Sequence, residues 1–184
     1  VMARKIIEHF RHATRTKPGI HLNQSGVQVA RKLGKSCGPY DLVVTSPLAR
    51  AIETAIAMGF AIDHTEKFLA DIPNNVNRRV SYDAGFAAFA KKIEGRDPVI
   101  EKYIAEMKRF HRRLLRLIPE GGRALLVSHG GVVEWAALSV YFRARKWGKA
   151  LDKCEGIRLV FKSGECVDAR PLRLKKKQKK VSSE

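Results

Sequence analysis

Two kinds of apolar segment alternate along the chain. Three short runs rich in Ile, Leu, Val and Phe, at 5–10, 41–46 and 123–128, are typical of buried β-strands. Other segments place apolar residues every three or four positions, which is the pattern of an amphipathic helix with one face in the core. These predicted helices lie at 23–34, 47–59, 85–93, 98–118 and 132–142.

Residues at the ends of the predicted helices support this assignment. Asn23 is a good N-cap, because its side chain can accept a hydrogen bond from an unpaired N–H of the first turn. Pro47 suits a first helical turn, where its missing N–H is not needed. Gly34 is placed to end the first helix.

The order of the segments indicates the fold class. Strands alternate with helices, and the segment 156–172 predicts a β-hairpin that turns at Ser163-Gly164. Alternating strands and helices build a parallel sheet with helices on both of its faces. We therefore expect a single three-layer α/β/α domain with a mostly parallel central sheet, an antiparallel C-terminal edge hairpin and a small cap insertion.

Length and composition suggest one domain with a tail. The 184 residues, 45% of them hydrophobic, suit one compact core, and no repeat or Gly/Ser-rich linker divides them. We assign 1–170 to this domain. The least regular stretch, 60–97, contains a predicted loop at 72–79, and we expect a cap region at about 72–100. The segment 171–184 is strongly basic and predicts a disordered tail.

The charge balance narrows the classes of ligand. The chain has 36 Lys and Arg against 18 Asp and Glu, a formal net charge of +18. This excess favours anionic ligands such as phosphate esters, nucleic acid or anionic lipid. The basic tail is either a solvated end or a weak contact for nucleic acid or an anionic surface, in which case binding falls steeply with salt.

The sequence also disfavours several classes of protein. No apolar run is long enough to cross a bilayer, and no apolar signal core precedes a cleavage site near the first residue. We therefore expect no transmembrane segment and a cytoplasmic location. Cys37, Cys154 and Cys166 form no CxxC pair, which predicts reduced thiols and no zinc framework. No clustered metal-ligand spacing is present, so we expect no metal or other cofactor.

Basic and imidazole side chains follow each of the three predicted buried strands. Arg11-His12 follows the first strand, Arg50 lies one turn into the helix after the second, and His129-Gly130 follows the third. In such sheets, ligands bind beyond the carboxyl ends of the strands. Guanidinium groups match phosphate oxygens, a glycine lets the backbone approach an anion, and a neutral imidazole can attack phosphorus. The sequence therefore predicts a phosphate site at this edge of the sheet.

Four motifs carry a resemblance to a known family. They are "FRHA" at 10–13, "HLNQSGVQVARKLG" at 21–34, "VVTSPLARAIETA" at 43–55 and "LLVSHGGVVEWAAL" at 125–138. In order and rough spacing they resemble the nucleophile motif, first helix, S-P-x-x-R segment and second-histidine motif of the histidine phosphatase superfamily, which has the phosphoglycerate-mutase-like fold. The middle of the chain and the tail lie outside the resemblance.

The resemblance implies roles for the residues that match. His12 would be the nucleophile that becomes phosphohistidine, and His129 would act beside it in catalysis. Arg11, Arg50, His129 and Gly130 would bind the substrate through its transferring phosphoryl group. The cations around His12 should lower the pKa of its imidazole and keep it neutral for attack.

The family also uses a carboxylic acid that protonates the leaving oxygen. Asp71 occupies that position in this sequence, and Asp83 and Asp97 are substitutes for it. Glu134 lies about one turn after His129, where it faces either the pocket or solvent. The sequence leaves both the choice of acid and the place of Glu134 open.

These observations predict a metal-independent histidine phosphatase, a phosphoric monoester hydrolase acting on a phosphorylated small molecule or a phosphorylated protein side chain. One alternative is a catalytically weak phosphate- or polyanion-binding module on the same fold. Another is a phosphoglycerate-type mutase, although that branch typically has an Asn shortly after the nucleophile, where this chain has Thr14 and Thr16. The oligomeric state stays open, since an edge hairpin can pair with a second chain or remain unpaired.

Overall fold

The computed structural model describes residues 3–70 and 72–175 of the chain. Its strands are β1 (Lys5–Arg11), β2 (Leu42–Thr45), β3 (His64–Thr65), β4 (Arg123–Ser128), β5 (Gly156–Lys162) and β6 (Glu165–Leu172). These strands form one sheet in the order β3-β2-β4-β1-β5-β6. The first four in this order pair in parallel, whereas β5 pairs antiparallel with both β1 and β6.

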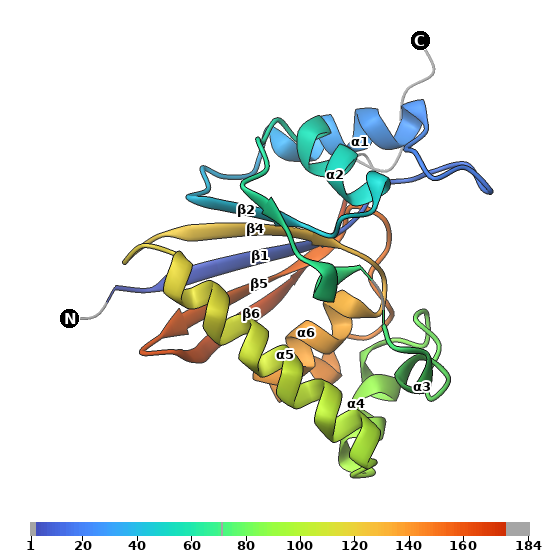
Figure 1. The fold of residues 1–184 in the computed structure, drawn as a ribbon, viewed down its shortest axis with the longest axis vertical. Coiled ribbons are helices and arrows are strands. Elements are labelled where there is room, and N and C mark those ends of the chain that lie inside the picture. The colour runs from blue at the N-terminus through green and yellow to red at the C-terminus, as the bar shows by residue number, and fades with distance from the viewer. Residues whose placement is uncertain (1–2, 71, 176–184) are drawn as a thin grey trace.

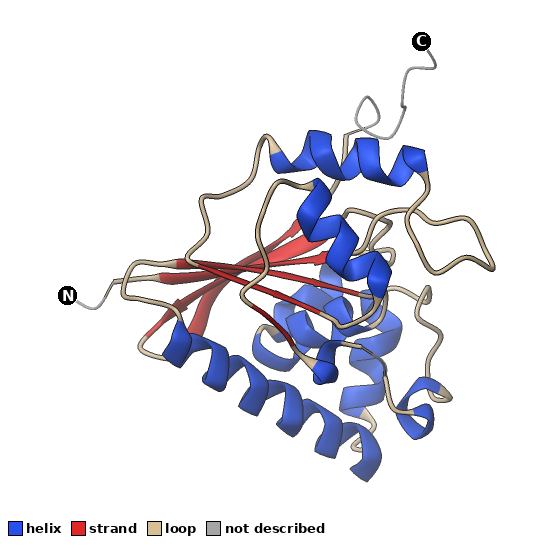
Figure 2. Ribbon diagram, turned by 45° about the horizontal axis from the view of Figure 1, so that its top comes forward, coloured by secondary structure: helices blue, strands red, loops and turns tan. Residues whose placement is uncertain are grey.

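Helices cover both faces of the sheet. They are α1 (Gln24–Gly34), α2 (Ala49–Ala57), α3 (Asn74–Asn77), α4 (Phe86–Glu94), α5 (Pro98–Leu117) and α6 (Val132–Val140), with short 3-10 helices η1 (Lys67–Leu69) and η2 (Phe142–Lys146). Figures 1 and 2 show α1 and α2 on one face and α5 and α6 on the other. The chain is thus the three-layer α/β/α domain, with a mostly parallel sheet and an antiparallel edge hairpin, that the sequence predicts. None of the helices in the described ranges has the length and apolar content that a bilayer crossing requires.

The position of β4 explains why its segment is apolar throughout. Ala124 and Leu126 belong to the apolar cluster shared with α4, α5 and α6, whereas Leu125 and Val127 belong to the cluster shared with α1 and α2. All four side chains are completely buried. Because successive side chains of a strand point to opposite faces, a strand covered on both faces needs apolar residues at every position.

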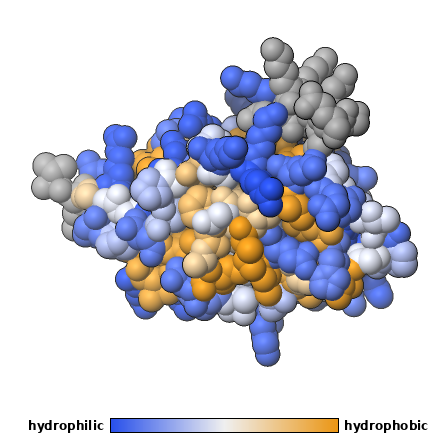
Figure 3. Space-filling view, turned by 90° about the horizontal axis from the view of Figure 1, so that it is seen from above, coloured by the Kyte–Doolittle hydropathy of each residue, from blue (hydrophilic) through white to orange (hydrophobic). Residues whose placement is uncertain are grey.

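The face that α1 and α2 cover keeps some apolar surface. Figure 3 looks down on this side of the molecule and shows apolar residues among charged ones. Ile56 on α2 is 60% exposed. Together with Leu22, Val27 and Met58 it lines a groove beside these two helices.

The structure differs from the predicted elements mainly in the middle of the chain. The sequence predicts neither β3 nor α3, because β3 has two residues and α3 has four, too few to show a period. Helix α2 begins at Ala49, two residues after Pro47, since the chain first turns, with the Leu48 N–H donating to Ser46 Oγ at 3.2 Å. The predicted cap is confirmed: the Gly26 N–H donates to Asn23 Oδ1 at 2.8 Å.

The C-terminal hairpin is confirmed, and the fold continues beyond its predicted end. Strands β5 and β6 pair on either side of the turn at 163–164. Arg173, just after β6, forms an ion pair of 3.0 Å with the buried carboxylate of Glu155. The tail therefore starts later than the predicted residue 171, because strand pairing and this ion pair fix 171–173. Most of the predicted disordered tail, 176–184, lies outside the described residues.

Gly34 is required by the approach of α1 to the end of α2. A Cβ atom at Gly34 would lie 1.9 Å from the carbonyl oxygen of Met58. Substituting Gly34→Ala should therefore lower the free energy of unfolding by about 2 kcal/mol or more, as overpacking of a core does. Gly95→Ala is the matched control, because its φ is −70° and its nearest atom would be 3.4 Å away. Urea denaturation measures both; equal losses in the two variants would contradict the packing argument.

Candidate active site

The carboxyl ends of β1, β2 and β4 bring the predicted site residues together. In the parallel pair of β1 and β4, Arg11 lies opposite Ser128, so the next residues, His12 and His129, are neighbours. The His12 N–H donates to the Ser128 carbonyl at 2.8 Å. The two imidazole rings lie 5.2 Å apart between centroids, at an interplanar angle of 58°. The two histidine motifs, more than a hundred residues apart in sequence, therefore form one site.

The hydrogen bonds of His12 define which ring nitrogen can react. Its Nδ1 lies 2.7 Å from the carbonyl oxygen of Ala13, and because a carbonyl only accepts, Nδ1 carries the hydrogen. Its Nε2 lies 3.2 Å from Arg50 Nε and 3.4 Å from Lys153 Nζ, both of which donate. The Nε2 lone pair therefore faces two cationic groups and is free of a hydrogen of its own.

Both histidines of the site are neutral near pH 7. Burial lowers the pKa of His12 to about 2, and the charge of Lys153 is the next largest cause. Burial also lowers the pKa of His129 to about 3, with further lowering by Arg50 and Lys153. The sequence argument gave the cations as the cause, whereas the structure adds burial as the larger one, because a charged imidazole loses its hydration there.

Arg11 is held in place by the chain around it. Its Nη1 donates to the Leu151 carbonyl at 2.7 Å. Its guanidinium carbon lies 5.5 Å from the centre of the Tyr82 ring, in the predicted cap region. A Cβ atom at Gly130 would lie only 2.8 Å from that carbon. Gly130 therefore makes room for the Arg11 guanidinium, a more specific reason for glycine than the close approach of backbone to an anion.

Glu134 is neither in the pocket nor at the surface, the two places that the sequence left open. Its side chain is completely buried. One carboxylate oxygen accepts from the Gly131 N–H at 2.7 Å and the other from the Leu151 N–H at 2.8 Å. Burial raises the pKa of this carboxyl group. Glu134 therefore connects the turn after His129 to the loop that contacts Arg11.

The second imidazole is oriented by the segment after β2. Ser46 Oγ lies 2.8 Å from His129 Nε2 and accepts from the Leu48 N–H on its other side. A hydroxyl has one hydrogen and two lone pairs, so Ser46 Oγ can accept from the Leu48 N–H and hydrogen-bond to the imidazole at the same time. The ring of His129 is thereby fixed beside His12.

The three candidate carboxylic acids have different positions. Asp71 lies outside the described residues. Asp83 is exposed and accepts from the Ser81 hydroxyl. Asp97 caps α5 through the Val99 N–H at 2.9 Å and pairs with Arg79, and the hydrogen bond from Arg79 is the main cause that lowers its pKa. These contacts explain why an Asp stands at position 97. A general acid needs a raised pKa, whereas the pKa of Asp97 is lowered, so this residue does not suit the role.

Lys153 is the residue of the site that sequence reasoning missed. It lies in the loop between η2 and β5, at 147–155, and is partly buried. Burial lowers its pKa to about 8, and the charges of Arg11, Arg15 and Arg50 lower it further. It belongs to no motif, and one lysine among 36 Lys and Arg carries no signal of its own.

The site is strongly electropositive and contains no cluster of metal ligands. The charges of Arg50 and Lys153 act on both histidines, and those of Arg11 and Arg15 act on His129. Within 3–70 and 72–175, no group of three or more His, Cys, Asp or Glu side chains is placed to hold a metal ion. Such a site suits a small anion with several oxygens, and a phosphoryl group matches the guanidinium forks.

The chain belongs to the histidine phosphatase superfamily (branch 1), whose family model matches residues 9–167. No curated protein sequence matches this chain. Among solved structures it is similar to a phosphoglycerate mutase from Bacillus anthracis str. Sterne (TM-score 0.62, 16% identity, covering 94% of this chain and 93% of that one).

Two phosphatase structures are similar as well. A mutant phosphoserine phosphatase from Entamoeba histolytica, in complex with phosphoserine, has a TM-score of 0.60 at 18% identity and covers 98% of this chain and 100% of that one. A mycobacterial glucosyl-3-phosphoglycerate phosphatase has a TM-score of 0.57 at 15% identity and covers 85% and 92%. At these identities the similarities establish the phosphoglycerate mutase-like fold.

Proposed function

We propose that this protein is a phosphatase that hydrolyses phosphomonoesters through a phosphohistidine intermediate on His12. The observation that carries the proposal is the orientation of His12, whose Nε2 has no hydrogen and faces Arg50 at 3.2 Å while Nδ1 is bound to a carbonyl. A neutral, oriented imidazole surrounded by guanidinium groups is what nucleophilic attack on a phosphate requires.

The substrate phosphate binds between the cations and the two imidazoles. Arg11 and Arg50 supply guanidinium N–H donors for its oxygens. The ring centre of His129 lies 5.2 Å from that of the nucleophile, His12. In phosphoryl transfer, catalysis is mainly positioning and stabilisation of charge on the equatorial oxygens. Fixed cationic side chains supply that stabilisation here.

The reaction has two displacements at phosphorus. First, His12 Nε2 forms a bond to phosphorus while the bond to the ester oxygen breaks, and a carboxylic acid gives that oxygen a proton. Asp71 is the proposed acid, by its position in the sequence. Water then attacks the phosphohistidine, the carboxylate takes the proton of the water, and the P–N bond breaks to release phosphate and the free imidazole.

The substrate is a small phosphomonoester or a phosphorylated protein side chain. Two similar structures are phosphatases of small phosphate esters, phosphoserine in one case and glucosyl-3-phosphoglycerate in the other. Tyr82, which is 46% exposed, places an aromatic ring beside Arg11 at the site. We propose that this part of the cap contacts the group attached to the phosphate.

Trapping the intermediate tests the proposed function. Wild-type protein turning over para-nitrophenyl phosphate should carry phosphate that is stable to alkali and labile to acid, and mass spectrometry should locate it in the peptide that contains His12. Turnover should be unchanged in EDTA, because the site supplies cationic side chains where other phosphatases use metal ions.

Two other outcomes would replace the proposal. Phosphate binding with neither turnover nor phosphoenzyme would indicate the anion-binding module. Isomerisation of a phosphoglycerate that depends on added bisphosphoglycerate would indicate the mutase. Phosphate attached to a residue other than His12 would contradict the mechanism.

A further inference from the structure

The loop at 147–155 crosses the carboxyl end of β1 and is bound to it. The Cys154 N–H donates to the Arg11 carbonyl at 3.1 Å, and the Arg11 N–H donates to the Glu155 carbonyl at 2.9 Å. The Arg11 guanidinium in turn donates to Leu151 O. Lys153, between these contacts, reaches His12 Nε2 at 3.4 Å. The loop thus brings an ammonium group to the atom that would attack phosphorus.

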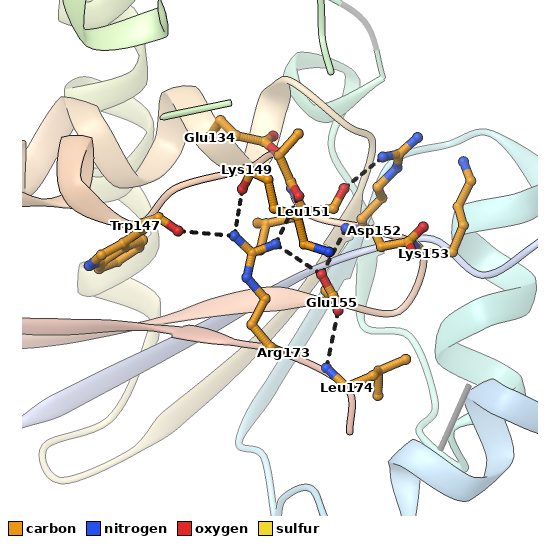
Figure 4. Close-up of polar contacts among 11 residues, drawn as sticks. Glu134, Trp147, Lys149, Leu151, Asp152, Lys153, Glu155, Arg173 and Leu174 are labelled. Carbon is orange, nitrogen blue, oxygen red and sulfur yellow. Dashed lines mark hydrogen bonds and ion pairs between the residues drawn. The ribbon is translucent and has the colours of Figure 1, made fainter. Parts of the chain in front are cut away.

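A second arginine, Arg173, binds the backbone of this loop. Arg173 donates to the carbonyl oxygens of Ala150 at 2.8 Å and Trp147 at 3.2 Å, and also to that of Lys149. It pairs with Glu155, whose carboxylate also accepts from the Asp152 N–H at 2.9 Å. Figure 4 shows Arg173 on one side of the loop and Lys153 on the other. Lys153 therefore projects from a loop whose backbone is fixed at several points.

The charges around Lys153 favour an anion beside it. Arg11 on β1, Arg15 in the loop after β1 and Arg50 on α2 all act on it with like charge. Asp152, on its own loop, acts with opposite charge. The two histidines that face it, on the turns after β1 and β4, are neutral. Bringing four cations together costs free energy, and a phosphoryl dianion between them offsets it.

We propose that Lys153 is a catalytic residue, whose ammonium group binds a non-bridging oxygen of the transferring phosphoryl group beside His12. This proposal rests on the proposed phosphatase function and adds a residue that is outside the motifs of the sequence. Lys153 and Arg50 both donate to His12 Nε2. Arrival of the phosphate draws both donors to its oxygens and exposes the nitrogen lone pair for attack.

The geometry also separates Lys153 from the acid that protonates the leaving group. In an in-line displacement the leaving oxygen lies on the far side of phosphorus from the attacking nitrogen. Lys153 Nζ lies within 3.4 Å of that nitrogen, on the near side. Its partner is therefore an equatorial oxygen, and the proton of the leaving alcohol comes from another group.

Lys153→Met and Lys153→Arg test this role, with Lys146→Met as the control on an exposed lysine of η2. We expect Lys153→Met to lower kcat/KM for para-nitrophenyl phosphate by about 10²-fold and to weaken binding of inorganic phosphate, measured by calorimetry, about tenfold. Lys153→Arg should retain most of the phosphate binding, because it keeps the charge, and Lys146→Met should behave as wild type.

The pH profile distinguishes a phosphate contact from a structural effect. The pKa of Lys153 is about 8. Since the protonated form binds the anion, kcat/KM of the wild type should fall as pH rises through this value. That fall should be absent from Lys153→Met and from Lys153→Arg, whose guanidinium stays charged.

Phosphate binding is measured without turnover, so it tests Lys153 even if the phosphatase function fails. The proposal is overturned if Lys153→Met binds phosphate within about threefold of wild type and its kcat/KM keeps the wild-type alkaline fall. Suppose that the wild type binds phosphate but shows no turnover, and that Lys153→Met loses this binding. That result would support the role of Lys153 and would refute only the proposed hydrolysis.

Discussion

Replacing His12 by asparagine should lower kcat for para-nitrophenyl phosphate by about 10⁴-fold or more, because the two-step path needs a nitrogen that forms a bond to phosphorus. An amide has no basic lone pair on nitrogen, so no phosphoenzyme can form. The cationic side chains proposed to bind phosphate remain, so inorganic phosphate should still bind to the variant. Steady-state kinetics and intact-mass measurement of the quenched protein report both effects.

His64→Asn is the control for this substitution. His64 is an exposed histidine of β3 and lies outside the site. Its replacement should leave kcat unchanged, and the quenched variant should contain as much phosphoenzyme as the wild type. If His12→Asn retained wild-type turnover, the assignment of the nucleophile would be wrong.

Replacing Glu134 by alanine should lower the free energy of unfolding by about 3 kcal/mol or more. Its carboxylate is the acceptor for the buried N–H groups of Gly131 and Leu151. Each unsatisfied buried donor costs about 1–3 kcal/mol. Glu134→Gln should cost less, because the amide oxygen still satisfies one of the two donors. Urea denaturation measures these differences.

An exposed glutamate provides the comparison for Glu134. Glu165, at the start of β6, is solvent-exposed, and its replacement by alanine should change the stability by less than about 0.5 kcal/mol. Because Glu134 connects the turn after His129 to the 147–155 loop, its loss should also weaken phosphate binding. Equal stability of Glu134→Ala and Glu165→Ala would show that the two hydrogen bonds contribute nothing.

The sequence predicts the features that depend on local patterns, such as the buried strands and the residues that follow them. The strand β4 is buried on both faces and reads as a continuous apolar run. His12 and His129 each follow such a run directly, and the carboxyl ends of parallel strands meet at one edge of a sheet. The convergence of the two imidazoles is therefore visible before any coordinates.

Other parts of the site depend on contacts that no local pattern records. Lys153 reaches His12 across 141 positions of sequence, from an irregular loop. A charged residue such as Glu134 is normally found at the surface. Its burial is explained by the hydrogen bonds that its carboxylate accepts from two backbone N–H groups distant from each other in sequence. Tyr82 lies in the predicted cap region, where short elements show no period. The sequence therefore predicts that His12, His129 and the two motif arginines lie together, but not Lys153, the burial of Glu134 or the position of Tyr82.

The order of the strands has a consequence for synthesis of the protein. Among the described strands, β1 is made well before its neighbour β5, and the loop before β5 carries Lys153. A nascent chain that has emerged only through α6 already contains both imidazoles and both motif arginines, but its first strand still has an open edge. The proposed phosphate site should therefore reach its full affinity only once β5 and β6 have left the ribosome and the 147–155 loop has docked on β1.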